Sequence, residues 1–256
     1  MAIGGQKWWP GVIAALLLAV VLPVSAPERV DALPTAGSVG TSDDFEAPNV
    51  DLATWAPVDP TGQGQISLAL GTVAIAPGGD SWVDDFSTRI EQLVENEDFD
   101  IVVEFPSLPT ARYSSVGTTL RSGSSWLRIG LTGTGSGTSL TAIANTGGAP
   151  LVRVNQPVES DIARMRVTRS GSHYMVWTAP DDGDWRLAGS FVEHLPVERM
   201  ALFGATRSAD APAVAISDFS ASEPVVERGE DTTGPLIQAV ASRSEGNDLV
   251  VTFSTD

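Results

Sequence analysis

The chain has 256 residues, a net charge of −17 and no cysteine. Without cysteine it forms no disulfides, thiolate metal sites or thiol nucleophiles. Its acidity argues against nucleic-acid or anionic-membrane partners, because phosphate contacts need clustered Lys and Arg, and Lys7 is the only lysine. A hydrophobic content of 42% with 25 Gly and 17 Pro is typical of a turn-rich β-domain with a sizeable core.

The N-terminus resembles a targeting segment. Lys7 precedes an apolar run of eleven residues, 12–22, which is shorter than a bilayer span requires. We expect residues 1–32 to be a signal peptide cleaved near residue 26 or 32, and an uncleaved signal anchor is the alternative. The mature chain would then be secreted or displayed at the cell surface, without membrane insertion. Residues 33–41 are rich in Pro, Ala, Gly and Ser and predict a flexible lead-in.

Alternating apolar and polar runs then follow one another along the chain, bounded by Gly, Pro and Asp, as expected for β-strands. Residues 84–96 are ambiguous, because they fit either an amphipathic helix or a strand through residues 90–94. The predicted strands occupy residues 65–70, 71–76, 98–105, 116–121, 126–131, 140–144, 151–154, 163–168, 173–178, 185–187, 200–206 and 214–219.

The most regular pattern lies at residues 164–187, where the turns at 170–172 and 180–184 separate three strands. This string resembles the "R-x-G" hairpin and "Y-x-x-x-x-D-G-x-x-W" meander of concanavalin A-like jelly rolls, the lectin and glucanase superfold; Asp182 stands where that family usually has Gly. Ser42-Asp-Asp-Phe45 and Ser217-Asp-Phe219 resemble the family's first and last strands, which are neighbours. The resemblance implies an all-β, antiparallel β-sandwich over residues 42–222, and a strand at 90–94.

The composition changes after residue 222. Residues 223–234 contain mainly Pro, Glu, Arg and Gly and predict a linker. Residues 235–256 resemble the opening of a fibronectin type III module, which needs about 90 to 100 residues to form a sandwich. We therefore expect a monomeric domain within a longer modular chain, followed by an incomplete second module.

Catalytic motifs are hard to find. Glucanases of this superfold carry "E-x-D-x-E" or "E-x-D-x-x-E" on one strand, which places an acid and a nucleophile in the cleft. The nearest string is Asp98-Phe-Asp100 with Glu104, and we interpret it as a solvated strand face. There is no "H-E-x-x-H" and no "G-x-S-x-G". The sequence favours a protein that is not an enzyme, although a Ser–His–Asp triad remains open.

The alternation of side chains along each strand indicates candidate binding residues. Trp126 and Arg128 point away from the apolar residues of their strand, as do His173 and Trp177. If both strands belong to the concave sheet, these four residues form one sugar-binding surface, because aromatic rings stack on pyranoses; packing of both Trp at a core edge is the alternative. We assign Trp185 to the core.

The leading hypothesis is a non-catalytic carbohydrate-binding module of an exported protein, whose partner is a polysaccharide or glycan. The alternatives are a glycoside hydrolase or lyase of the same superfold, and a structural or adhesion module without a ligand. No cofactor is required, but Asp43, Asp44 and Asp218 would gather if the first and last strands are neighbours. Carboxylates are preferred calcium ligands, so these three residues predict a structural calcium site.

Overall fold

The computed structural model describes residues 39–69, 71–81, 86–207 and 212–224, together with the backbone of residues 237–245 and 248–255. The chain divides into two units at Pro224–Val225. The expected signal peptide, most of the lead-in, nearly all of the linker and Trp82 lie outside the described residues. The described part contains no helix long and apolar enough to cross a membrane.

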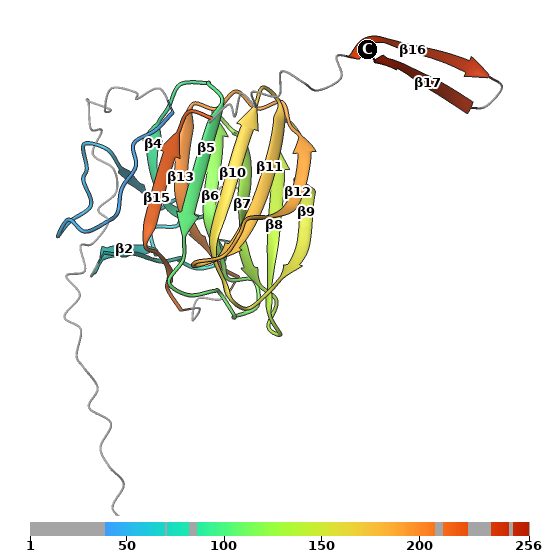
Figure 1. Cartoon of the computed structure of the whole chain (residues 1–256). Helices are drawn as coiled ribbons and strands as arrows, with labels where there is room; N and C mark the ends of the chain where they lie inside the picture. Colours follow the sequence, from blue (N-terminus) through green and yellow to red (C-terminus); the bar gives the residue numbers. More distant parts are fainter. Residues whose placement is uncertain are drawn as a thin grey trace, which may run out of the picture. The chain divides into compact units, whose positions relative to one another are not determined.

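Every element described is a β-strand, and the first unit is an antiparallel sandwich of two main sheets (Figure 1). The larger sheet has seven strands in the order β1-β4-β13-β6-β7-β8-β9. Their bounds are β1 Ala56–Val58, β4 Thr88–Leu93, β6 Ser115–Ser122, β7 Ser125–Gly133, β8 Thr138–Asn145, β9 Leu151–Val158 and β13 Arg199–Ala205.

The second main sheet has five strands in the order β12-β11-β10-β5-β15, and a small sheet has the order β14-β3-β2. The five-stranded sheet consists of β5 Phe99–Glu104, β10 Ile162–Ser170, β11 His173–Pro180, β12 Arg186–Val192 and β15 Asp218–Ser222. The small sheet consists of β2 Gln65–Leu68, β3 Val73–Ala76 and β14 Val214–Ile216. The expected fold class is therefore confirmed, and each of the twelve predicted strand regions overlaps an observed strand.

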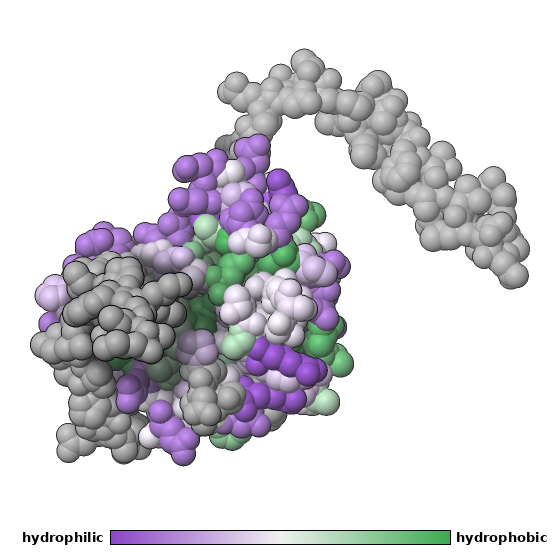
Figure 2. All heavy atoms as spheres, turned by 90° about the horizontal axis from the view of Figure 1, so that it is seen from below, coloured by the Kyte–Doolittle hydropathy of each residue, from purple (hydrophilic) through white to green (hydrophobic). Residues whose placement is uncertain are grey.

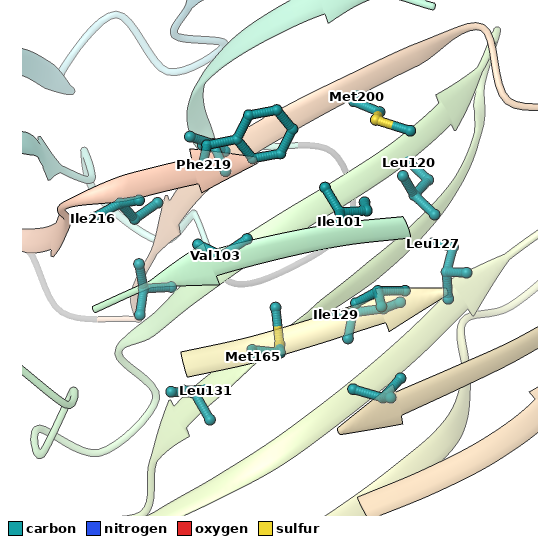
Figure 3. Packing of buried hydrophobic residues seen from close by; sticks show 14 of the residues in the cluster. Ile101, Val103, Leu120, Leu127, Ile129, Leu131, Met165, Met200, Ile216 and Phe219 are labelled. Carbon is teal, nitrogen blue, oxygen red and sulfur yellow. The ribbon is translucent and has the colours of Figure 1, made fainter. Parts of the chain in front are cut away.

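One side-chain layer between the main sheets forms the core (Figure 3). Ile101 and Met165 extend from the five-stranded sheet toward Leu120, Leu127 and Ile129 of the seven-stranded sheet, and all five are fully buried. Alternate residues of a strand point to opposite faces, so the residues between these core positions lie on the outer faces of the sandwich. At the lower end, Figure 2 shows hydrophobic residues in a recess bordered by hydrophilic ones.

The ambiguous segment at residues 84–96 contains strand β4, as the resemblance implied. Ile90 is buried in the core. The buried side-chain amide of Gln92 forms hydrogen bonds with the backbone of Thr41. Its Oε1 accepts from the Thr41 backbone N–H at 2.7 Å, and its Nε2 donates to the Thr41 carbonyl at 3.1 Å. The packed domain thus includes Val39 to Thr41, which we had placed in the flexible lead-in.

The first and last segments of the sandwich are neighbours, as expected. Asp43 and Phe219 form an antiparallel bridge with backbone hydrogen bonds of 2.8 and 3.0 Å. Trp55 packs against this seam with no exposed surface, and its indole Nε1–H donates to Asp43 Oδ2 at 2.8 Å. Its ring also meets Phe219 edge-on at 5.4 Å. Asp43 therefore satisfies the polar group of a fully buried Trp.

The second unit is described only as an antiparallel pair, β16 Ile237–Glu245 and β17 Asp248–Thr255. Two paired strands are compatible with many β-modules, so the fibronectin type III resemblance stays a prediction.

Candidate functional site

The four residues predicted to bind sugar do not share a surface. Trp126 and Arg128 lie on β7 of the seven-stranded sheet, whereas His173 and Trp177 lie on β11 of the five-stranded sheet. The parity assignment within each strand is correct, because their neighbours Leu127 and Val176 belong to the core. The two pairs consequently occupy opposite outer faces of the sandwich, and a single binding surface made of all four is wrong.

Trp126 is not an exposed stacking platform. Only 2% of its surface is exposed, and the Arg128 guanidinium lies 5.6 Å from its ring centroid and 5.5 Å from that of buried Phe203. Phe203 is flanked in register by Gly117 and Gly130, and a Cβ at Gly130 would approach the Phe203 ring to 3.1 Å. The glycines let Phe203 lie flat on the sheet, so this half of the outer face is filled by protein side chains.

Two arginines on this filled half share one carboxylate. Glu91, which is 8% exposed, accepts hydrogen bonds from Arg89 at 3.0 Å and from Arg199 at 3.1 Å. A buried carboxylate shared by two guanidiniums is held in one geometry, and removing it would leave uncompensated positive charge. Glu91 is thus a structural residue of the sheet face.

The outer face of the five-stranded sheet offers aromatic rings that arginines already cover. The Arg166 guanidinium lies 5.3 Å from the Trp177 ring centroid. It donates to Asp100 from Nε, at 2.9 and 3.1 Å, and from Nη2, at 2.5 Å. Asp100 is 7% exposed, so the solvated strand face predicted around it is wrong at this residue. Trp185, which we had assigned to the core, is half-buried outside it, with Arg164 5.1 Å from its ring. His173 is exposed.

A pocket of about 330 Å³ lies on the other half of the outer face of the seven-stranded sheet. We call it the Tyr113 pocket. Side chains of β7, β8 and β9 form its floor, the turn between β7 and β8 forms one rim, and the loop before β6 forms the other. The lining residues are Arg112, Tyr113, Thr132, Gly133, Thr134, Ser139, Thr141, Ile143, Val152 and Asn155. Its volume falls within the range of small-ligand sites.

Hydroxyl groups run in a line across the pocket floor. Thr132 Oγ1 lies 3.0 Å from both Ser115 Oγ and Thr141 Oγ1, and Thr141 Oγ1 donates to the Gly130 carbonyl at 3.3 Å. Each hydroxyl has one proton, and Thr141 gives its proton to the Gly130 carbonyl. Thr132 must therefore donate to Thr141, and Ser115 must donate to Thr132. Thr141 keeps one acceptor lone pair for a ligand. Asn155, its cross-strand partner, is exposed and supplies both a donor and an acceptor.

Backbone hydrogen bonds fix the loop that carries Tyr113. The Tyr113 N–H donates to the Gly133 carbonyl at 2.9 Å, and the Gly133 N–H donates to the Ser114 carbonyl at 2.8 Å. Gly133 is required for this approach, because a Cβ there would lie 2.2 Å from the Ala111 carbonyl oxygen. Tyr113 itself has a φ of 62°, a left-handed conformation that non-glycine residues seldom adopt and that recurs at ligand sites.

The predicted calcium ligands surround a second hollow of about 330 Å³, lined by Asp43, Asp44, Asp218 and their neighbours. Both carboxylate oxygens of Asp43 accept hydrogen bonds from the protein. Oδ1 accepts from the Phe45 N–H at 2.8 Å, and Oδ2 accepts from the Trp55 indole N–H. Burial raises the pKa of Asp218, and the charges of Glu104, Asp44 and Asp43 raise it further. Within the described residues, no group of three or more His, Asp or Glu is arranged to hold a metal ion.

Comparison with solved structures finds the same sandwich in carbohydrate-active and sugar-bound proteins. The GH43 BlXynB protein of Bacillus licheniformis has a TM-score of 0.60 at 13% identity, over 72% of this chain and 39% of that one. Xylan β-1,4-xylosidase of Bacillus halodurans has a TM-score of 0.57 at 14% identity, over 78% and 42%. The exoplasmic/lumenal domain of VIP36, with Ca²⁺ and Man3GlcNAc bound, has a TM-score of 0.51 at 12% identity, over 74% and 91%.

These likenesses establish the fold alone, because all three identities are low. The chain aligns with only about two fifths of each Bacillus protein. No protein family and no curated protein matches the sequence. The Tyr113 pocket therefore has to be interpreted from its own residues. Sequence patterns missed it because its rim comes from an irregular loop, although the tyrosine between Arg112 and two serines was a visible polar signal.

Proposed function

We propose that the sandwich is a non-catalytic carbohydrate-binding module of an exported protein and that it binds saccharide in the Tyr113 pocket. The observation that carries the proposal is the pocket floor, where the Thr132–Thr141 hydroxyl relay and the Asn155 amide face outward beside Ile143 and exposed Val152. Sugars combine hydroxyl groups with apolar C–H faces, and protein sites for them pair directed polar groups with apolar walls. The Tyr113 pocket offers both.

The chemistry of the lining favours binding over hydrolysis. Glycosidases of the usual kind need two carboxyl groups about 5 to 9.5 Å apart across the scissile bond. The described residues that line the Tyr113 pocket include neither Asp nor Glu. Glu91, a carboxylate described on the same face, is buried between two arginines and is not placed to donate a proton to a ligand. We therefore favour a module that holds a glycan over one that cleaves it.

The structural neighbours support the carbohydrate class of the ligand. VIP36 is solved with Man3GlcNAc bound, and another similar structure, with a TM-score of 0.51, is the CBM2 module of the evolved Dit of Lactobacillus casei BL23 phage J-1. Both are covered almost completely by the matched sandwich, at 91% and 96% of their lengths. The same architecture thus occurs as a separate sugar-bound domain.

A glycan array screened with the whole chain tests the proposal, together with Thr141→Val and Asn155→Ala. Thr141→Val keeps the shape of the side chain and removes the acceptor, so we expect binding to weaken about two- to tenfold, the net value of one neutral hydrogen bond. Thr168→Val is the matched control, because Thr168 lies on the outer face of the five-stranded sheet. Absence of glycan binding by the unmodified chain, or equal binding by Thr141→Val and wild type, would refute the proposal.

A further inference from the structure

Two arginines from distant parts of the chain meet at one ring on the rim of the Tyr113 pocket. The Arg112 guanidinium lies 4.8 Å from the Tyr113 ring centroid, and the Arg207 guanidinium lies 4.9 Å from it. Both distances are within the range of cation–π contacts. Arg112 belongs to the loop before β6, whereas Arg207 follows β13, so the fold brings two like charges to the same ring.

Neither arginine has an acidic partner among the described residues. The ion pairs there involve Arg89, Arg153, Arg166, Arg186 and Arg199. This is unexpected in a chain with 32 Asp and Glu against 15 Lys and Arg. Arg112 and Arg207 are both exposed, and the described pocket lining contains no carboxylate. The rim of the Tyr113 pocket is therefore a positive position on a strongly acidic protein.

The platform for these charges is fixed before any ligand arrives. Tyr113 is held by its hydrogen bond to Gly133, and its loop is tied a second time where Thr138 Oγ1 donates to the Pro109 carbonyl at 3.0 Å. A platform held in a left-handed backbone conformation reduces the ordering that ligand binding would otherwise require. The arginines themselves rest on the ring through cation–π contact. Among the described residues their N–H groups meet no acidic partner, so an anion can accept hydrogen bonds from them.

We propose that Arg112 and Arg207 bind the anionic group of an acidic sugar, whose ring lies against the hydroxyls of Thr132, Ser139 and Thr141. The inference rests on the proposed carbohydrate function and names its ligand class. The guanidinium fork matches the two oxygens of a carboxylate or of a sulfate. The chain's net charge does not prevent this, because at physiological salt charges beyond about 8 Å are screened, whereas these two arginines would touch the anion.

The test measures binding of the whole chain to oligogalacturonate and to the same oligosaccharide as its methyl ester, which removes the charge and keeps the sugar. We expect the acid to bind at least tenfold more tightly, and rising salt to abolish the difference. Arg112→Gln and Arg207→Gln should each weaken binding of the acid by about ten- to hundredfold, as expected for a hydrogen bond to a charged group, and leave binding of the ester unchanged. A sulfated galactan oligosaccharide shows whether sulfate replaces carboxylate.

Arg186→Gln is the matched control, because Arg186 is an exposed arginine on β12 that pairs with Glu159 at 2.6 Å. It should change neither affinity. Equal binding of acid and ester, both weakened by Thr141→Val, would overturn the charge inference and leave the carbohydrate proposal standing. Tighter binding of the acid that survives both arginine substitutions would also overturn it. Binding of neither oligosaccharide nor any other glycan would overturn both proposals.

Discussion

Tyr174→Phe should stabilise the sandwich, because the Tyr174 hydroxyl is buried without a hydrogen-bond partner among the described residues. The ring is fully buried between Phe191, stacked at 5.4 Å, and Phe99, edge-on at 6.3 Å. Substitution keeps these ring contacts and removes one unsatisfied polar atom, whose burial costs about 1 to 3 kcal/mol. We therefore expect the free energy of unfolding at neutral pH to rise by about 1 kcal/mol or more.

The same hydroxyl makes stability depend on alkaline pH. Burial raises the pKa of Tyr174 to about 12, from 10.0. The folded pKa lies above the unfolded one, so its contribution to stability is fully present below pH 10 and is lost as the pH rises toward 12. The difference of about two units between the folded and unfolded pKa corresponds to about 2.7 kcal/mol of folding stability. About 1.4 kcal/mol of this stability is lost at pH 11. Tyr174→Phe should show none of this loss.

Urea unfolding at neutral and alkaline pH measures both effects, and ultraviolet absorbance follows tyrosinate directly. The chain has two tyrosines, so Tyr113→Phe leaves Tyr174 as the sole tyrosine signal. Tyr113 is partly exposed, and its substitution serves as the control, with little change in stability expected. A loss of stability in Tyr174→Phe at neutral pH would show that the hydroxyl is hydrogen-bonded in solution. Titration of Tyr174 near pH 10 would contradict its burial.

Three further predictions concern the faces and the seam. Trp126→Ala should lower the free energy of unfolding by about 3 to 5 kcal/mol, as expected for a buried Trp, and Trp177→Ala should lower it less. Equal losses in the two variants would contradict the difference in burial. Asp218→Asn should stabilise by about 0.2 to 1 kcal/mol at neutral pH, because it removes a like-charge cross-strand pair with Glu104. Since the pKa of Asp218 is raised, this gain should disappear below about pH 4; a gain that persists in acid would have another cause. Calcium should raise the melting temperature if the predicted ion binds at Asp43, and identical melts with calcium and chelator would remove that site.

The strands were predictable because their determinants are local, whereas the sandwich that they form was implied by the family resemblance. The turns at residues 170–172 and 180–184 and the alternation between them define β10 and β11 without any distant contact. The neighbouring ends of the sandwich were predictable from the resemblance and not from parity, because the bridge between Asp43 and Phe219 joins residues far apart in sequence. Parity also placed Trp126 and Trp177 correctly within their own strands. Parity does not show which sheet each strand joins. Trp126 and Trp177 lie on opposite faces because β7 and β11 belong to different sheets.

Burial on the outer face depends on contacts that alternation does not encode. Alternation predicts that an outward Trp is exposed, yet Trp126 is buried because Arg128 lies close to both its ring and that of Phe203. Phe203 fits on this face because Gly117 and Gly130 lie beside it in register. A pocket opens only where the outward residues are short. The polar outward residues of β7 and β8 near the Tyr113 loop are Thr132, Ser139 and Thr141, and they leave the space that larger side chains fill elsewhere.

The charge pattern follows the same physical logic. The acidic surface would repel an anionic ligand at long range, but screening limits that repulsion to roughly a Debye length. What decides binding is the charge that touches the ligand, and the described residues around Tyr113 place two guanidiniums and no carboxylate there. An acidic protein with a small positive pocket should therefore reject anionic polymers in general and accept an acidic sugar that reaches both arginines. That selectivity should weaken as salt is added, because the local attraction is screened as well.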